Sequence, residues 1–253
     1  MKTDTLKLPH GYTVDIHIDE HSANPFEDWD CEPPIAVFCE RKIENYKGGD
    51  LNLPVLLSHI PAEKWETREG KREVANALPW SLREIGEAMR GYYGDQTFRD
   101  AVEELAGESA PCGWGDAGEY FDTMERVAHV AGVPCYNGQS NGYSQGGSAL
   151  VFVAALPDWV GKVGAGGDLR EQCRATFELW SAWAWGDVYG VATMYRPNGE
   201  EIKDGSCWGF YGGDHKKSGL MAHCESMVEY DRDNLRRERA AWNDAACRDI
   251  ATV

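Results

Sequence analysis

The segment that most constrains the fold lies late in the chain, where two strand-like runs flank a tight turn. Residues 188–195 and 202–211 are rich in β-branched and aromatic residues, which are typical of strands. Between them stands Pro197-Asn198-Gly199-Glu200. Asn-Gly is a strong hairpin signal because both residues tolerate the positive φ that such a turn requires. We therefore expect an antiparallel hairpin, and hence a sheet, in this part of the chain.

Further strand and helix patterns are spread along the rest of the chain. Residues 12–18, 35–39 and 149–156 read as strands, and residues 137–148 read as a polar, glycine-rich loop. Ser81 and Glu84 have capping-box spacing, and Leu82 begins the apolar stripe that we expect to face the core. Other helices are expected after the candidate N-caps Asp95, Asp116 and Asp168, and again from residue 216 to near the end.

These patterns together predict an α+β fold. The sheet is expected to be mixed or antiparallel, with a C-terminal hairpin and a helical block in the middle of the chain. No segment has the composition of a linker, so we expect residues 1–253 to form a single compact unit. The helical stretch at about 60–132 is a candidate insertion within it.

The charge balance limits the classes of partner. The chain has 42 acidic and 25 basic residues, and its net charge is −17. A field of this sign repels phosphate backbones and anionic lipid, so we expect no direct binding to nucleic acid and none to membranes. A basic protein is the partner that this charge favours, in particular one that itself binds nucleic acid. A solvated acidic surface without a partner is the alternative.

The sequence gives no sign of export, cofactor or metal. Its first residues contain no apolar run of the kind found in signal peptides, and no stretch reaches the ~18 apolar residues that span a bilayer. We expect a cytoplasmic protein whose eight cysteines are free thiols. No two cysteines have Cys-x-x-Cys spacing, and no P-loop or dinucleotide fingerprint is present. We therefore predict no metal and no cofactor.

One short motif points to hydrolysis. Residues 142–146 match G-x-S-x-G, the strained turn that lifts a serine nucleophile clear of the backbone. This motif resembles that of cutinases and related serine esterases, which would make Ser144 the nucleophile, with Asp187 or Asp204 and then His215 or His223 completing a triad. The alternative is a polar turn whose side chains bond to the local backbone.

The hairpin itself carries a candidate binding site. Antiparallel pairing brings the segments 186–190 and 206–212 together. Alternation predicts Trp208 and Phe210 on one face, and Cys207 and Tyr211 on the other. The functional interpretation is an aromatic pocket or partner surface with Asp187 at its rim. The alternative is a hairpin buried on both faces. The candidate binding residues are Asp187, Tyr189, Trp208, Phe210 and Tyr211.

A second candidate binding segment is Asp28-Trp29-Asp30, which stands among further carboxylates near the start of the chain. Carboxylate oxygens in this spacing suit a hard cation such as Ca²⁺, but the remaining ligand positions of an EF-hand loop are missing. The alternative is an acidic surface loop. We take the three residues as candidates for contact with a protein partner.

Several of these motifs, taken in order, resemble an uncharacterised family of small proteins carried by bacteriophages and mobile elements. The resemblance implies a host-cell setting, not a reaction, so it supplies no catalytic residues. It implies a non-enzymatic accessory protein that binds and inhibits a host protein, such as an anti-CRISPR or anti-restriction factor. A serine hydrolase and a small-molecule or nucleotide-binding protein remain the alternatives. The residues that carry the resemblance are Asp28-Trp29-Asp30, Cys39, Arg41, Tyr46, Gly49-Asp50, Tyr143-Ser144-Gln145-Gly146, Gly186-Asp187-Val188-Tyr189-Gly190 and Ser206-Cys207-Trp208-Gly209-Phe210-Tyr211-Gly212.

Overall fold

The computed structural model describes residues 2–20, 22, 35–39, 47–48, 51–90, 96–108, 114–141, 148–157, 168–202 and 205–251. The chain folds into two compact units. The terminal unit comprises Met1–Ala23 and Gly186–Val253, and the central unit comprises Asn24–Trp185. The expectation of a single compact unit stays a prediction.

The terminal unit is an antiparallel sheet built from both ends of the chain. Strand β7 (Val188–Tyr195) pairs with β2 (Thr13–Ile18) on one side and with β8 (Glu201–Ile202) and β9 (Cys207–Tyr211) on the other. Strand β1 (Lys2–Lys7) pairs with β2, to which the short 3-10 helix η1 (Pro9–Gly11) connects it. The predicted hairpin is confirmed, although its second strand is divided into β8 and β9.

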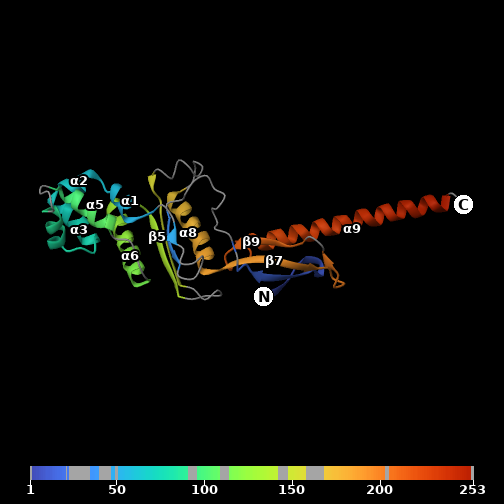
Figure 1. The fold of residues 1–253 in the computed structure, drawn as a ribbon. Helices are drawn as coiled ribbons and strands as arrows, with labels where there is room; N and C mark the ends of the chain where they lie inside the picture. The colour runs from blue at the N-terminus through green and yellow to red at the C-terminus, as the bar shows by residue number, and fades with distance from the viewer. Residues whose placement is uncertain are drawn as a thin grey trace. The chain divides into compact units, whose positions relative to one another are not determined.

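One face of this sheet packs against the long helix α9 (Leu220–Ala251) (Figure 1). The strand predicted over residues 12–18 is confirmed as β2, and Val14 and Ile16 are fully buried on this face. They lie opposite Met194 and Val191 of β7. The first half of α9 covers these strands with a stripe of buried side chains, formed by Leu220, Cys224 and Val228.

The central unit contains a second antiparallel sheet, in the strand order β4-β3-β6-β5. The apolar run that predicted a buried strand forms β6, and Ala149 to Ala154 are buried on both faces. The helical block packs on one face, where Phe121 of α6 meets Phe152 of β6, and α8 packs on the other (Figure 1). The elements are α1 (Leu53–Ser58), α2 (Ala62–Glu66), α3 (Arg68–Ala77), α4 (Leu82–Met89), α5 (Phe98–Glu108), α6 (Trp114–Ala131), α8 (Leu169–Trp185), β3 (Ile35–Cys39), β4 (Lys47–Gly48), β5 (Cys135–Asn141) and β6 (Ser148–Ala154).

The α+β class, the antiparallel sheets and the middle helical block are therefore as predicted. The capping box of Ser81 and Glu84 is present, with the Glu84 amide donating to Ser81 Oγ at 3.2 Å. Asp168 caps α8, since its side chain accepts from the Arg170 amide at 3.0 Å. The part of the chain that the structure describes contains no helix long and apolar enough to cross a membrane.

Three local predictions are wrong. Residues 137–141 are not a loop but part of β5, because the ladder with β6 satisfies their backbone groups despite a polar composition. Leu82 does not face the core, since it is 64% exposed at the first position of α4. Asp116 lies inside the first turn of α6 and is not its N-cap. Asp95 lies outside the described residues, and Thr97 caps α5 in a reciprocal bond with Asp100.

Candidate functional site

A bulge in the predicted hairpin decides which way its aromatic side chains point. Tyr189 pairs with Phe210, but Val191 pairs with Cys207, so the single residue Gly190 of β7 lies opposite two residues of β9. Gly209 absorbs the extra length with a φ of 88°, a conformation that glycine adopts without strain. The bulge interrupts the alternation of β9. Trp208 and Phe210 therefore lie on opposite faces, and the prediction that they share one face is wrong.

On the face covered by α9, the predicted site residues pack against the core. Tyr189 and Phe210 both contact the buried cluster, and the Phe210 ring lies 5.5 Å from that of His223 on α9. Cys207 of β9 also points to this face, where it lies near Cys224 of α9. Burial, and next the neighbouring Cys207 thiol, raise the pKa of Cys224 to about 11. These side chains match the alternative of a buried hairpin on this face only, and they support the site from behind.

The opposite face of the sheet, which we call the outer face, carries Trp208 as an exposed aromatic. Its side chain is 49% exposed. It packs over Gly190, where a Cβ atom would stand only 2.0 Å from Cε3 of the indole. The ring of His17, which pairs with Gly190 in the ladder, meets Trp208 edge-on at 6.4 Å. Gly190 and His17 thus fix the position of a tryptophan that still presents half of its surface.

The outer face around Trp208 is polar and at least partly exposed. Strand register places its members on one side, opposite the buried Val14, Ile16 and Met194. On this face Asp15 is oriented by a 2.8 Å hydrogen bond from the Thr5 hydroxyl. Its members are Thr5, Lys7, Thr13, Asp15, His17, Thr193, Tyr195, Glu201 and Trp208.

A second cluster of titratable groups lies where β7 begins. The ring of His215 meets that of Tyr189 edge-on at 4.9 Å, and Nδ1 of His215 is buried with no hydrogen-bond partner among the described residues. Burial raises the pKa of the Asp187 carboxyl above its ordinary value. Burial, and next the charge of Asp187, raise the pKa of Tyr189. The Asp187 carbonyl accepts a 2.7 Å hydrogen bond from the Gly212 amide. This bond joins the segments 186–190 and 206–212, as predicted from the hairpin.

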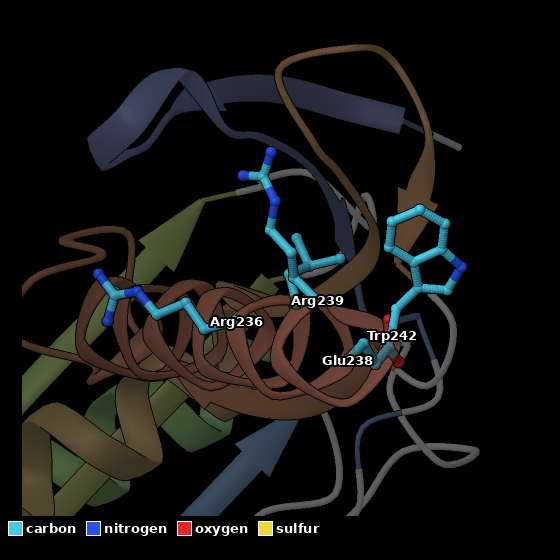
Figure 2. Close-up of a pocket in the computed structure, with 5 residues that line it drawn as sticks. Arg236, Glu238, Arg239 and Trp242 are labelled. Atoms are coloured by element: carbon cyan, nitrogen blue, oxygen red, sulfur yellow. The ribbon is translucent and has the colours of Figure 1, made fainter. Parts of the chain in front are cut away.

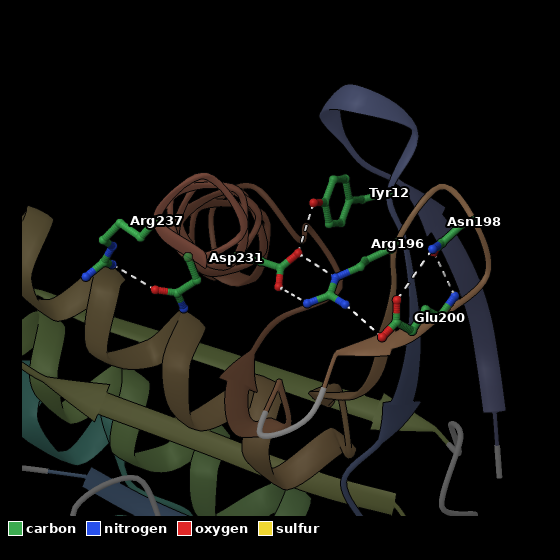
Figure 3. A network of polar contacts seen from close by, with 7 residues as sticks. Tyr12, Arg196, Asn198, Glu200, Asp231 and Arg237 are labelled. Carbon is green, nitrogen blue, oxygen red and sulfur yellow. Dashed lines mark hydrogen bonds and ion pairs between the residues drawn. The ribbon is translucent and has the colours of Figure 1, made fainter. Parts of the chain in front are cut away.

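A polar network that the sequence did not indicate fixes α9 to the sheet (Figure 3). Arg196, which follows β7, donates from two nitrogens to Asp231 of α9, at 2.9 and 2.6 Å. The Tyr12 hydroxyl donates to the same carboxylate at 3.0 Å, and Glu200 pairs with the Arg196 guanidinium from the turn. The Arg196 hydrogen bonds hold the pKa of Asp231 below its ordinary value. No local pattern could have revealed this pairing, because its members are far apart in the sequence.

Several predicted site residues fall in segments that the structure does not describe. Ser144, the proposed nucleophile, and Asp28, Trp29 and Asp30 all lie outside the described residues. Within the described ranges, no three His, Cys, Asp or Glu side chains are grouped so that they could hold a metal ion. The structure does bring two members of the proposed triad, Asp187 and His215, to the same tyrosine.

Comparisons with protein-family models, with curated proteins and with solved structures gave no match for this chain.

Proposed function

We propose that this chain is a non-enzymatic binding protein that engages a basic protein through the outer face of its terminal unit. The observation that carries the proposal is the half-exposed Trp208, held over Gly190 and beside His17. Tryptophan is enriched among the residues that dominate protein–protein binding energy, and a ring fixed before binding loses little entropy when it is buried.

The charge of the chain supports a basic partner. A net charge of −17 attracts cationic proteins over several ångströms and repels phosphates. Asp15 and Glu201 lie on the outer face itself and add negative charge close to Trp208. A partner that normally grips nucleic acid presents such cationic surface.

The finer proposal is an anti-CRISPR or anti-restriction factor in the host cytoplasm. It follows from the resemblance of the sequence motifs to a family of proteins carried by bacteriophages and mobile elements. Tyr189 and Phe210 lie on the α9 face, behind Trp208. Asp187, just before β7, and Tyr211, at the end of β9, are proposed as further contacts. Asp28, Trp29 and Asp30 are proposed as a further contact with the same partner.

We expect Trp208→Ala to lower the amount of basic protein captured from host lysate by about tenfold or more, because a fixed aromatic anchor is lost. Quantitative mass spectrometry of the captured proteins measures this. Tyr230→Ala is the matched control, because Tyr230 is 61% exposed on α9 and does not belong to the outer face. Capture by wild type and control should fall together as salt is raised. Equal capture by Trp208→Ala and wild type at low salt would contradict the proposal.

The Asp187 cluster favours a second candidate function, which is binding or turnover of a small molecule. Among the described residues, the buried Nδ1 of His215 has no hydrogen-bond partner, and His215 and the partly buried Asp187 carboxyl group both lie near Tyr189. Groups of this kind are common at small-molecule sites. If Ser144 is a nucleophile and His215 its base, a fluorophosphonate probe should label Ser144 in the wild type, and His215→Ala should lose the label. If the cluster binds a nucleotide or a divalent cation, that ligand should raise the melting temperature of the wild type more than that of His215→Ala. Absence of both effects would exclude this candidate.

A further inference from the structure

The described side chains of α9 that are buried all lie in the first half of the helix. Leu220, Cys224 and Val228 pack against the sheet, and the Asp231 network follows them. Beyond that network the helix carries a shallow, exposed depression (Figure 2), lined by Leu235, Arg236, Glu238, Arg239 and Trp242. The contacts of the first half therefore decide how firmly α9 is held to the sheet.

Two free cysteines lie on the two sides of this contact, one on the sheet and one on the helix. Cys207 of β9 stands opposite Val191 of β7 in the strand ladder. Residues that pair in this way point to the same face of a sheet. Val191 is buried in the same cluster as Cys224 of α9. Cys207 therefore points to the face that α9 covers.

The directions of the strands and the helix fix which part of α9 Cys207 meets. Tyr189, at the start of β7, meets the ring of His215, which precedes α9. Arg196, just past the end of β7, bonds Asp231 well inside the helix. Strand β7 and α9 thus run in the same direction. Because β9 pairs antiparallel with β7, it runs opposite to α9.

This opposed direction places Cys207 beside Cys224. The ring of Phe210, near the end of β9, lies 5.5 Å from that of His223. A step back along β9 from Phe210 to Cys207 is therefore a step forward along α9 from His223. Cys224 is the next residue of the helix and is buried against the sheet. The charge of Cys207 accordingly contributes, after burial, to the raised pKa of Cys224.

The two thiols differ in their access to solvent. Cys207 is partly exposed, on a strand that pairs only with β7 among the described strands. Cys224 is fully buried. Burial raises the pKa of Cys224 to about 11, so this thiol is protonated at neutral pH and is a poor nucleophile towards reagents in solution. An oxidant that arrives from solution therefore meets Cys207 first.

We propose that Cys207 and Cys224 form a redox-sensitive pair, which hydrogen peroxide converts into a disulfide that links β9 to α9. The Cys207 sulfur attacks the peroxide, so that an S–O bond forms, the O–O bond breaks, and the thiol proton leaves with hydroxide as water. The Cys224 sulfur then attacks the sulfenic acid at Cys207. An S–S bond forms, the S–O bond breaks, and the Cys224 proton leaves in a second water. The two thiols thus supply the two electrons that reduce one peroxide to two waters.

The other two cysteines whose side chains the structure describes are not arranged for such a bond. Cys135 of β5 packs against the cluster formed by the helical block. Cys173 of α8 lies on the other face of that sheet, with its Sγ 3.4 Å from the Val153 carbonyl oxygen. A disulfide needs its two Cβ atoms within about 4.5 Å and directed towards each other. Cys173 therefore provides a matched control, since it is as fully buried as Cys224.

Peptide mapping of the non-reduced chain after treatment with a small excess of hydrogen peroxide tests this proposal. The folded wild type and Cys173→Ala should both yield a disulfide between Cys207 and Cys224. In Cys224→Ala, Cys207 should remain a sulfenic acid that dimedone traps. Absence of the disulfide in the folded wild type, or an equal yield in urea, would overturn the proposal. An unlabelled Cys207 in Cys224→Ala would overturn the order of attack.

Thermal unfolding of the oxidised and the reduced chain measures what the link does. The disulfide closes the loop of residues 207–224 and lowers the entropy of the unfolded chain, so it should raise the melting temperature of the terminal unit by roughly 10 °C. Dithiothreitol should reverse this gain, and Cys224→Ala should not show it. A wild type that contains the disulfide and melts at an unchanged temperature would contradict a link that fastens β9 to α9.

Discussion

Replacing Asp231 by alanine is expected to lower the free energy of unfolding of the terminal unit by about 3 kcal/mol, because the substitution leaves the Arg196 guanidinium without its main partner. Asp231 is 4% exposed and accepts three hydrogen bonds, two from Arg196 and one from Tyr12. This network joins α9 to Arg196, which follows β7, and to Tyr12, which precedes β2. Its loss should release the helix beyond Val228 as well as lower overall stability.

Urea unfolding combined with amide hydrogen exchange measures both effects. Glu200→Ala is the matched control, because Glu200 pairs with the same guanidinium from an exposed position. Exposed ion pairs contribute up to about 1 kcal/mol, so the control should change little. Unchanged exchange of the α9 amides beyond Val228 in Asp231→Ala would show that apolar packing alone holds the helix.

The same carboxylate makes stability depend on pH. Arg196, through its hydrogen bonds, lowers the pKa of Asp231 in the folded chain. The stabilisation is therefore fully present above the ordinary aspartate pKa of about 3.9 and is lost as the pH falls below that value. The wild type should lose more unfolding free energy on acidification than Asp231→Ala, because the variant has already lost this term.

Replacing Gly190 by alanine is expected to lower partner capture as much as removing Trp208, although the tryptophan remains in the chain. A Cβ atom at position 190 would lie 2.0, 2.4 and 2.6 Å from three carbons of the indole. Such distances are far inside van der Waals contact, so the ring must leave its position beside His17. The half-exposed ring can swing outward, so the stability cost should stay near the lower end of the ~1–3 kcal/mol range for overpacking.

A double-mutant cycle separates this explanation from a general loss of structure. If Gly190 acts only by placing Trp208, then Gly190→Ala should change nothing further in a Trp208→Ala background. Capture assays on the wild type, the two single variants and the double variant give the coupling energy for binding. Urea unfolding of the same four proteins gives the coupling energy for stability. Independent, additive losses of capture would mean that Gly190 has a role apart from the indole.

Local signals predicted much of the fold, and long-range contacts account for most of what was missed. Asn198-Gly199 predicted the hairpin because turn geometry depends on adjacent residues, and Arg196 and Glu200 do close that turn through a 2.8 Å backbone hydrogen bond. Residues 137–141 were misread because their polar composition is typical of loops. Their strand conformation comes from the ladder with β6, which only tertiary structure provides.

The candidate site could be predicted only in part for the same reason. The aromatic cluster around Trp208 was visible in the sequence, but its division between two faces depends on the bulge at Gly209. A glycine there is equally compatible with a regular strand, so sequence alone could not assign the faces. Asp187 and His215 were proposed through a motif centred on Ser144, and the structure shows them beside Tyr189, which the motif does not include.

The central claim, that Trp208 is presented on the outer face for a protein partner, is most directly tested by fluorine NMR of chain labelled with 5-fluorotryptophan. Trp208→Phe removes one resonance and so assigns it. In the free chain this resonance should show a solvent isotope shift, and adding the purified captured protein should abolish that shift while the resonance of Trp242 keeps its own. A Trp208 resonance that is already protected in the free chain, or that is unchanged by the partner, would contradict the claim.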